Sequence, residues 1–263
     1  PRTIAFSAAG DAWVTSRDAG VASVIDPVSF TVKRTVALPS ASQPYGIVFS
    51  PADGSAWVGL AATGEVARVE PSSGTVTARI DVGGGEPRHL AITGSGDRLL
   101  VSRFITAPIP AESTRTPTGS DAGGVVHGGE LTVIDPRTTA VTSRVTLALT
   151  GGTDTGTRSR GVPNYLAAAA IAPDGLSAWV PSKQDNVQRG RYRDDFALDF
   201  QSGVRAITSK VLLGPLPVED AVQRLDLDNS SQSSAAAFEP KGRYLFVALE
   251  TSRVRRHRCA RGA

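Results

Sequence analysis

The sequence of 263 residues has no methionine, one cysteine and three histidines. One cysteine excludes an internal disulfide, so packing must hold the fold together, which a periplasmic or extracellular location allows but does not require. No apolar run approaches the roughly 18 residues that a membrane-spanning helix needs. The missing initiator methionine, and a first residue that already lies inside a repeat, predict a piece of a longer protein without its natural start or any signal peptide.

Acidic residues are missing from the last eleven positions, which read RVRRHRCARGA and include five arginines. Without these five, the 28 basic residues fall to 23 against 25 acidic ones, so the tail accounts for the positive net charge. A basic run can bind nucleic acid or a membrane surface, but nothing else in the chain supports such a partner. We therefore expect residues 1–252 to form the fold and residues 253–263 to be a truncation or reading-frame artefact in place of a strand.

A repeated segment fills the rest of the chain. Five copies align, and they read PRTIAFSAAGDAWV, PYGIVFSPADGSAWV, PRHLAITGSGDRLLV, PNYLAAAAIAPDGLSAWV and SSAAAFEPKGRYLFV. The first two steps are 43 residues each, and three copies continue into SVIDP, RVEP or TVIDP. A fixed period of this length indicates a repeat architecture.

Apolar residues alternate within each copy, as in Ile4 and Phe6, which is the spacing of β-strands. Turn signals such as Asp53-Gly54 separate the strands. Four short strands per period are typical of a propeller blade, in which each four-stranded antiparallel sheet packs on the next. A β-sandwich also has many short strands but does not predict a repeated unit. We therefore predict an all-β propeller with about four full blades and a partial fifth.

Two copies carry insertions. The third contains ITAPIPAESTRTPTGSDAGGVVHGG, which is rich in Pro, Thr and Gly and indicates a flexible loop. The fourth contains KQDNVQRGRYRDDFALDFQSG before the strand VRAITSKVLL. Its mixture of charged and aromatic residues favours an ordered loop that touches a partner.

The second copy, PYGIVFSPADGSAWVGLAATGEVARVEPSSGTVTARIDVG, resembles the YVTN-type β-propeller repeat of bacterial surface and periplasmic proteins. The resemblance extends to about residue 252 and implies part of a larger, seven-bladed propeller. The chain departs from the pattern at Leu100, which replaces an aromatic, at Glu70, which replaces Asp, and where Trp13, Trp57 and Trp179 take the Tyr place.

Two segments, GVPNYLAAAAIAPDGLSAWVPSKQDNVQRG and SSAAAFEPKGRYLFVALETSR, resemble a subset of large secreted bacterial propellers. Some of these are joined to cytochrome c peroxidase-like haem modules. The resemblance implies a periplasmic or extracellular location and, as a partner, a protein or a missing cytochrome-like domain. Covalent haem needs Cys-x-x-Cys-His, so we expect no cofactor in this chain and haem only in a missing module.

The repeated acids Asp26, Glu70 and Asp135 each precede a proline. A ring of metal-binding or catalytic carboxylates is one interpretation of this repeat. The simpler one is turn chemistry, in which each carboxylate accepts hydrogen bonds from backbone N–H groups. We favour the turn, and we expect the three tryptophans to fill the core between blades.

Residues at the mouths of the innermost strands are the first candidates for a binding site. The same point of the repeat is occupied in successive blades by Arg2, Tyr45, Arg88 and Asn164, and His89 directly follows Arg88. A ring of Arg and Tyr at one end of a channel could receive an anionic ligand or an acidic loop of a partner; the alternative is that these are solvated entry-loop residues. His127 and His257 lie far apart in the sequence, so no pair of histidines has metal-ligand spacing.

The second candidate is the start of the insertion in the fourth copy. Lys183, Asp185 and Asn186 precede Asp194 and Asp195, so oxygen ligands for a cation are available. Their spacing matches no calcium loop and the intervening arginines oppose a cation. We therefore predict a docking loop, with a merely solvated loop as the alternative, and no metal site.

Catalytic motifs are missing: the chain has no Gly-x-Ser-x-Gly and no phosphate-binding loop. We therefore expect a non-catalytic binding or scaffold propeller of a secreted bacterial protein, able to form oligomers through open propeller edges. The alternative is the propeller arm of a redox enzyme, haem peroxidase-like or quinone-dependent dehydrogenase-like, or a lactonase-like enzyme. That alternative requires convergent titratable groups, with Arg88 and His89 the first candidates.

Overall fold

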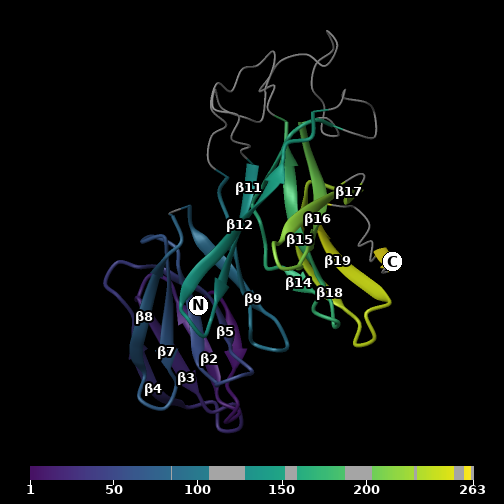
Figure 1. Cartoon of the computed structure of the whole chain (residues 1–263). Helices are drawn as coiled ribbons and strands as arrows, with labels where there is room; N and C mark the ends of the chain where they lie inside the picture. The colour runs from purple at the N-terminus through teal and green to yellow at the C-terminus, as the bar shows by residue number, and fades with distance from the viewer. Residues whose placement is uncertain are drawn as a thin grey trace. The chain divides into compact units, whose positions relative to one another are not determined.

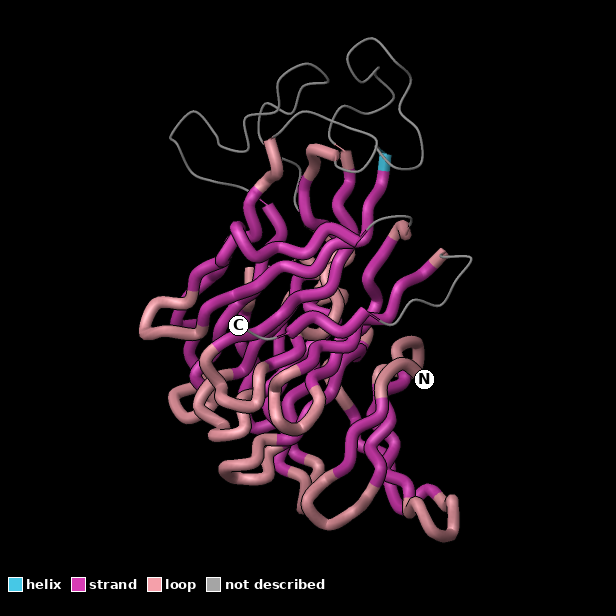
Figure 2. The backbone as a smooth tube through the Cα atoms, turned by 90° about the vertical axis from the view of Figure 1, so that its right-hand side faces the viewer, coloured by secondary structure: helices cyan, strands magenta, loops and turns pink. Residues whose placement is uncertain are grey.

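The computed structural model of the chain describes residues 1–83, 85–106, 128–151, 159–186, 203–227 and 230–251, and the backbone of 258–261. Nearly all of the described chain is strand or short turn (Figure 2). Among these residues, no helix has the length and apolar character that crossing a bilayer would require. The chain divides into two compact units, residues 1–104 with 132–143 and residues 105–131 with 144–263.

The first unit contains two complete four-stranded antiparallel sheets (Figure 1). The strands of the first are β1 (Ile4–Phe6), β2 (Ala12–Ser16), β3 (Val21–Ile25) and β4 (Val32–Ala37). Those of the second are β5 (Pro44–Phe49), β6 (Ala56–Leu60), β7 (Glu65–Glu70) and β8 (Thr75–Asp81). In both sheets every strand pairs with its neighbour in sequence. Each sheet is therefore one propeller blade.

The third sheet follows the same order, and the division between the units runs through its last two strands. Its strands are β9 (Pro87–Ile92), β10 (Leu99–Arg103), β11 (Gly128–Asp135) and β12 (Ala140–Ala148). The insertion that we predicted as a flexible loop lies mostly at residues 107–127, outside the described residues.

The fourth sheet differs from the prediction at its innermost strand. The strands are β13 (Val162–Asn164), β14 (Ala170–Ile171), β15 (Ser177–Asp185), β16 (Val204–Leu212) and β17 (Val218–Leu227). The single strand expected from PNYLAAAAIA is split into β13 and β14, which both pair with β15. The split begins at Tyr165, whose φ of 53° cannot continue a strand.

The fifth sheet has three strands, β18 (Gln232–Phe238), β19 (Tyr244–Glu250) and β20 (Arg258–Arg261). Four complete blades and a partial fifth are what the repeat predicts. The arginine-rich tail contributes β20, which pairs with β19 between Tyr244 and Val247. Our view of that tail as an artefact remains a prediction.

One glycine in each copy makes the first hairpin turn possible. The five glycines have φ between 68° and 85°, a region that only glycine enters without strain, and they are Gly10, Gly54, Gly96, Gly175 and Gly242. These turns fix the register of the first two strands, so that the alternating apolar residues of both face the same neighbour. The sequence prediction of these turns is confirmed.

The core of each unit lies between successive sheets. Trp13 of the first sheet meets Phe49 of the second edge to face, with ring centroids 5.6 Å apart. Trp57 belongs to the cluster that also includes Ile92 of the third sheet, and Trp179 packs with Phe238 of the fifth. The predicted role of the three tryptophans between blades is confirmed.

The repeated acids close turns, as we expected. The Asp26 carboxylate accepts hydrogen bonds from the N–H groups of Val28 (2.8 Å) and Ser29 (3.1 Å), and Asp135 accepts one from Arg137 (2.8 Å). The backbone hydrogen bond from Ser29 lowers the pKa of Asp26. No three acidic, His or Cys side chains gather into a metal-binding group within the described residues.

Candidate functional site

Five side chains of the first unit converge where its innermost strands begin. Arg2 precedes β1, Tyr45 lies on β5, Arg88 and His89 lie on β9, and Phe104 follows β10. Three of the sheets contribute to this group because every copy of the repeat starts its first strand at the same end. We call these five residues the rim cluster.

A buried threonine ties the first sheet to the rim cluster. Thr15 on β2 is fully buried, and its hydroxyl donates a 2.5 Å hydrogen bond to the backbone oxygen of Tyr45. The same hydroxyl accepts a hydrogen bond from the N–H of Thr3 at 3.1 Å, which holds the segment carrying Arg2. Thr15 therefore fixes the backbones on either side of the Arg2–Tyr45 contact.

Two glycines bring the second sheet close to β9. A Cβ atom at Gly46 would lie 2.5 Å from the backbone oxygen of Arg88, and one at Gly59 would overlap the backbone oxygen of Pro87. Neither glycine has a positive φ. Glycine is therefore required at these two positions because a side chain would not fit, and not because the backbone conformation is unusual. This close approach allows Tyr45 to reach the side chains of Arg88 and His89.

Cations and rings alternate in the rim cluster. The Cζ atoms of Arg2 and Arg88 lie 5.8 Å and 5.3 Å from the centre of the Tyr45 ring, and Arg88 lies 3.8 Å from that of Phe104. His89 meets Tyr45 edge to face at 5.3 Å between ring centroids. Cation–π contacts hold a guanidinium by its face and leave its N–H groups free to bind an anion in the ring plane.

One acid already occupies part of this cationic surface. Glu86, which has a φ of 56°, places Oε2 2.5 Å from Nη2 of Arg88. The Nε of Arg88 is buried and has no hydrogen-bond partner within the described residues. That donor is enclosed by protein, so a ligand would reach Arg88 only at the part of the side chain that stays exposed.

His89 is uncharged at neutral pH. Burial, with a smaller contribution from the positive charge of Arg88, lowers the pKa of His89 from 6.5 to about 4. The positive charge of the rim cluster at neutral pH therefore comes from its two arginines. The His89 ring contributes an apolar and polarisable surface beside Tyr45 and Phe104.

The lowered pKa of His89 predicts how the stability of the folded chain depends on pH. The unfolded chain protonates His89 near pH 6.5 and the folded chain near pH 4, so the unfolded state binds more protons between these values. The free energy of unfolding should fall as the pH drops from 6.5 to 4, by up to about 3 kcal/mol. The His89→Gln variant should lose this part of the dependence when urea unfolding is followed at several pH values. A variant as pH-sensitive as the parent would contradict the assignment.

In the second unit, three of the predicted site residues form a network between β13 and β15. Asn164 donates a 2.8 Å hydrogen bond to Asp185 and accepts one of 3.0 Å from the N–H of Thr106. Lys183 lies 3.0 Å from Asp185 and 3.8 Å from the centre of the Tyr165 ring. These side chains satisfy one another and hold β13 against β15.

The predicted position of Lys183 and Asp185 in a loop is wrong. Both belong to β15, which pairs with β16 through Asp185 and Val204, so the insertion begins only at Asn186. Asn186 is buried and its N–H donates a 3.0 Å hydrogen bond to Gly203, closing the base of the insertion. Asp194, Asp195, His127 and His257 lie outside the described residues. The proposed docking loop remains a prediction.

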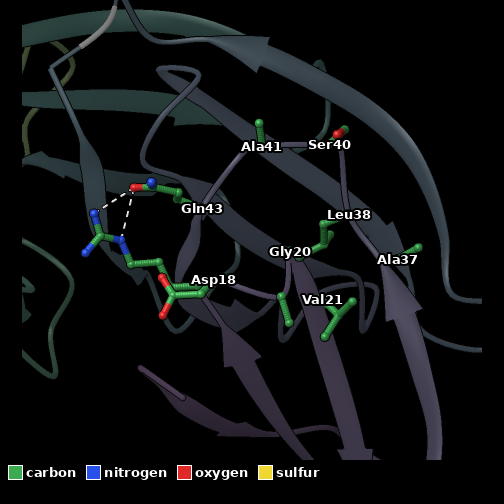
Figure 3. Close-up of a pocket in the computed structure, with 10 residues that line it drawn as sticks. Asp18, Gly20, Val21, Ala37, Leu38, Ser40, Ala41 and Gln43 are labelled. Atoms are coloured by element: carbon green, nitrogen blue, oxygen red, sulfur yellow. Dashed lines mark hydrogen bonds between the residues drawn. The ribbon is translucent and has the colours of Figure 1, made fainter.

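An open pocket of about 630 Å³ lies in the first unit beside the β2–β3 turn (Figure 3). Arg17 donates two hydrogen bonds to Oε1 of Gln43, at 3.0 Å and 2.7 Å. Gln43 lies immediately before β5, so the pocket opens at the same strand ends as the rim cluster. Arg17 is the one cation among the described residues that line this pocket, whereas two arginines converge on Tyr45 in the rim cluster, which makes the rim cluster the stronger candidate.

Sequence reasoning missed Phe104, Glu86 and the two close-approach glycines. Glycine inside the apolar strands PYGIVF and AWVGL is the signal that could have identified Gly46 and Gly59, because it marks close backbone approach. Glu86 stands one residue before the repeated proline and gives no such signal. Phe104 joins the cluster only through the pairing of β10 with β9.

No protein-family model matches the chain, and no curated protein matches it in sequence. Solved structures do share its fold. One is the hydrazine synthase of Kuenenia stuttgartiensis, with 16% identity, a TM-score of 0.53, and coverage of 94% of this chain and 72% of that one. Another is a candidate 6-phosphogluconolactonase from Bacteroides uniformis, with 13% identity, a TM-score of 0.57, and coverage of 93% of this chain and 62% of that one. Together with the blades described above, these similarities show a β-propeller fold.

Proposed function

We propose that the chain is a non-catalytic binding module and that the rim cluster binds a carboxylate group of an acidic protein partner. The observation that carries this proposal is the convergence of Arg2 and Arg88 on the ring of Tyr45. Fold alone does not carry it, because propellers serve many unrelated functions.

The contacts that each arginine can make with a ligand depend on its exposure and on the partners that it already has. Arg2 is exposed and has no ion pair within the described residues, so it offers a complete guanidinium fork. Arg88 already pairs with Glu86 and its side chain is 19% exposed, so a ligand carboxylate competes with Glu86 for it. A carboxylate lying between the two arginines would accept from both and rest against the edge of Tyr45, which excludes water on one side. Charge-assisted hydrogen bonds of this kind are roughly twice as strong as neutral ones.

Titration calorimetry with a hexaglutamate peptide tests the proposal. Arg2→Gln and Arg88→Gln should each weaken binding at least about tenfold, because each removes a charge-assisted hydrogen bond. Glu86→Gln should strengthen binding, since Arg88 then has no carboxylate of its own. Affinity of the parent chain should also fall as salt is added.

Arg79→Gln is the matched control. Arg79 lies on β8 of the same unit, pairs with Glu65 and takes no part in the rim cluster. The substitution changes the net charge by the same amount, so it should leave the affinity nearly unchanged. Equal losses in Arg79→Gln and Arg88→Gln would mean non-specific attraction, and no binding by the parent chain would reject the proposal.

The partner and the location are part of the same proposal. Resemblance to secreted propellers supports a periplasmic or extracellular protein that binds another protein or a cytochrome-like domain, with no cofactor in this chain. The fold neighbours include a candidate lactonase, so the enzyme alternative has a direct test. Measurable hydrolysis of 6-phosphogluconolactone that is lost in His89→Ala would favour the enzyme over the binding module.

A further inference from the structure

A pocket of about 300 Å³ lies in the second unit, where residues of the β18–β19 turn meet β15 and β16. Trp179 of β15 and Phe238 of β18 form an apolar part of its wall. Lys210 of β16 and, from the turn, Lys241 and Arg243 bring three cations to the same pocket. Its volume is at the lower end of the range of small-ligand sites. We call it the β18 turn pocket.

Lys210 is the most buried of the three cations, at 9% exposed. Its Nζ donates a 2.9 Å hydrogen bond to the neutral amide of Gln223 and lies 5.9 Å from the centre of the Trp179 ring. Asp220 stands opposite Lys210 on β17, but no ion pair joins the two. Burying a charge is costly unless an opposite charge compensates it. Lys210 therefore lacks, within the described residues, the anionic partner that its burial requires.

The cations of the turn are available to a ligand. Lys241 is exposed and has no ion pair within the part of the chain that the structure describes. Arg243 is also exposed, and its Nε lies 3.5 Å from Glu239. That carboxylate also accepts hydrogen bonds from the backbone N–H groups of Lys241 (2.9 Å) and Arg243 (2.7 Å), so it is largely used in closing the turn.

One acid opposes the three cations. Asp174 lines the pocket, and its Oδ1 accepts a 2.9 Å hydrogen bond from the N–H of Leu176. Three positive charges against one negative charge leave the described lining with an excess of two positive charges.

The first and second sheets form a pocket at the same point of the repeat, with the opposite balance of charge. Trp13 takes the place of Trp179 there, and Asp53 takes the place of Lys241, because each precedes the positive-φ glycine of its turn. The charged residues that line this other pocket are three acids and two cations, namely Asp11, Asp53, Glu70, Lys33 and Arg34.

Both cations of that other pocket have partners. Lys33 lies 2.8 Å from Asp11, and Arg34 donates a 2.7 Å hydrogen bond to the backbone oxygen of Ser72. The fold therefore does not require unpaired cations at this point of the repeat, and their presence in the β18 turn pocket points to a ligand.

We infer that the β18 turn pocket binds a phosphate group, either free or on a small organic ester. A phosphate carries up to two negative charges at neutral pH and has several acceptor oxygens, so it can compensate the whole excess and accept from cations on β16 and in the turn. A carboxylate would compensate only half of that excess. In an ester, the organic group would contact Trp179 and Phe238. The inference goes beyond the binding module proposed above and uses no residue of the rim cluster.

Titration calorimetry of the whole chain with phenyl phosphate tests the inference. Lys241→Gln and Arg243→Gln change exposed side chains, so both variants should fold, and each should bind about tenfold more weakly. Asp174→Asn should bind more tightly, because a carboxylate that repels the ligand becomes neutral. Weaker binding of inorganic phosphate would identify an ester as the ligand, and equal affinities would identify free phosphate.

Lys210→Met tests the buried cation separately. Without ligand, this variant should be at least as stable as the parent, because it removes a buried charge that has no partner. Phenyl phosphate should raise the unfolding temperature of the parent chain and have little effect on that of Lys210→Met. An equal rise in both would overturn the role of Lys210.

Lys33→Gln is the matched control, since it changes the net charge equally and lies in the corresponding pocket of the first and second sheets. It should bind phenyl phosphate like the parent. Equal losses in Lys33→Gln and Lys241→Gln would show non-specific attraction and overturn the inference. Benzoate binding as tightly as phenyl phosphate would overturn it as well, and so would a parent chain that binds neither phosphate compound.

Discussion

Gly59→Ala should destabilise the chain by about 3 kcal/mol, near the upper end of the cost of inserting a methyl group into a packed interior. The added Cβ would overlap the backbone oxygen of Pro87, and backbone cannot rotate away as a side chain can. The second sheet and β9 would have to separate, which removes contacts of Trp57 and Leu90 together. Urea unfolding followed by tryptophan fluorescence would measure the loss.

Gly94→Ala provides the comparison. Gly94 has no positive φ, and a Cβ there would meet nothing within 4 Å. Its effect should be small or slightly stabilising, because alanine restricts the unfolded chain. Similar losses for the two variants would show that the close approach of the sheets is not the cause. Gly46→Ala should resemble Gly59→Ala and should also weaken peptide binding, because its Cβ presses on Arg88.

Arg224→Met should cost about 3 to 5 kcal/mol, the usual effect of removing one partner of a buried ion pair. The side chains of Arg224 and Glu219 are only 9% and 5% exposed, and the two lie 2.5 Å apart. Arg224 also donates to the backbone oxygen of Ala148 (2.7 Å) and to Thr150 (2.8 Å). Its loss leaves Glu219 buried without its charge partner.

The double variant Glu219→Leu/Arg224→Met separates the cost of an unpaired buried charge from the cost of lost packing. It removes both charges, so it should recover part of the stability lost in Arg224→Met, although the backbone groups of Ala148 lose partners. Thermal unfolding of the parent chain, Glu219→Leu, Arg224→Met and the double variant would give the coupling energy. A double variant less stable than either single variant would show that the buried charge is not the main cost.

Sequence reasoning predicted the features that depend on local chemistry. Strand alternation, the turn glycines, the acids before proline and the tryptophans between blades each follow from a few neighbouring residues, and the structure contains all of them. The contact of Phe49 with Trp13 is one instance of the predicted packing of the tryptophans between blades.

The features that sequence reasoning missed depend on contacts between distant segments. β15 continues through Lys183 and Asp185 because β13 and β16 pair with it on both sides. β17 carries an irregularity opposite Ser209, which places Arg224 beside residues about 75 positions away. No pattern of neighbouring residues in the sequence indicates strand pairings of this kind. For the same reason the sequence placed Arg2, Tyr45 and Arg88 at equivalent points of the repeat but could not include Phe104.

In the first two sheets every ladder joins consecutive strands separated by short turns, and no ladder of the described sheets joins one blade to another. Only short loops must close before these two blades gain their hydrogen bonds, so little chain entropy opposes nucleation there. Folding can therefore begin in either of these blades and spread to its neighbours. A gene that gained or lost one 43-residue unit would leave each remaining ladder intact, so this topology lets the number of blades change during evolution without redesign of the strands.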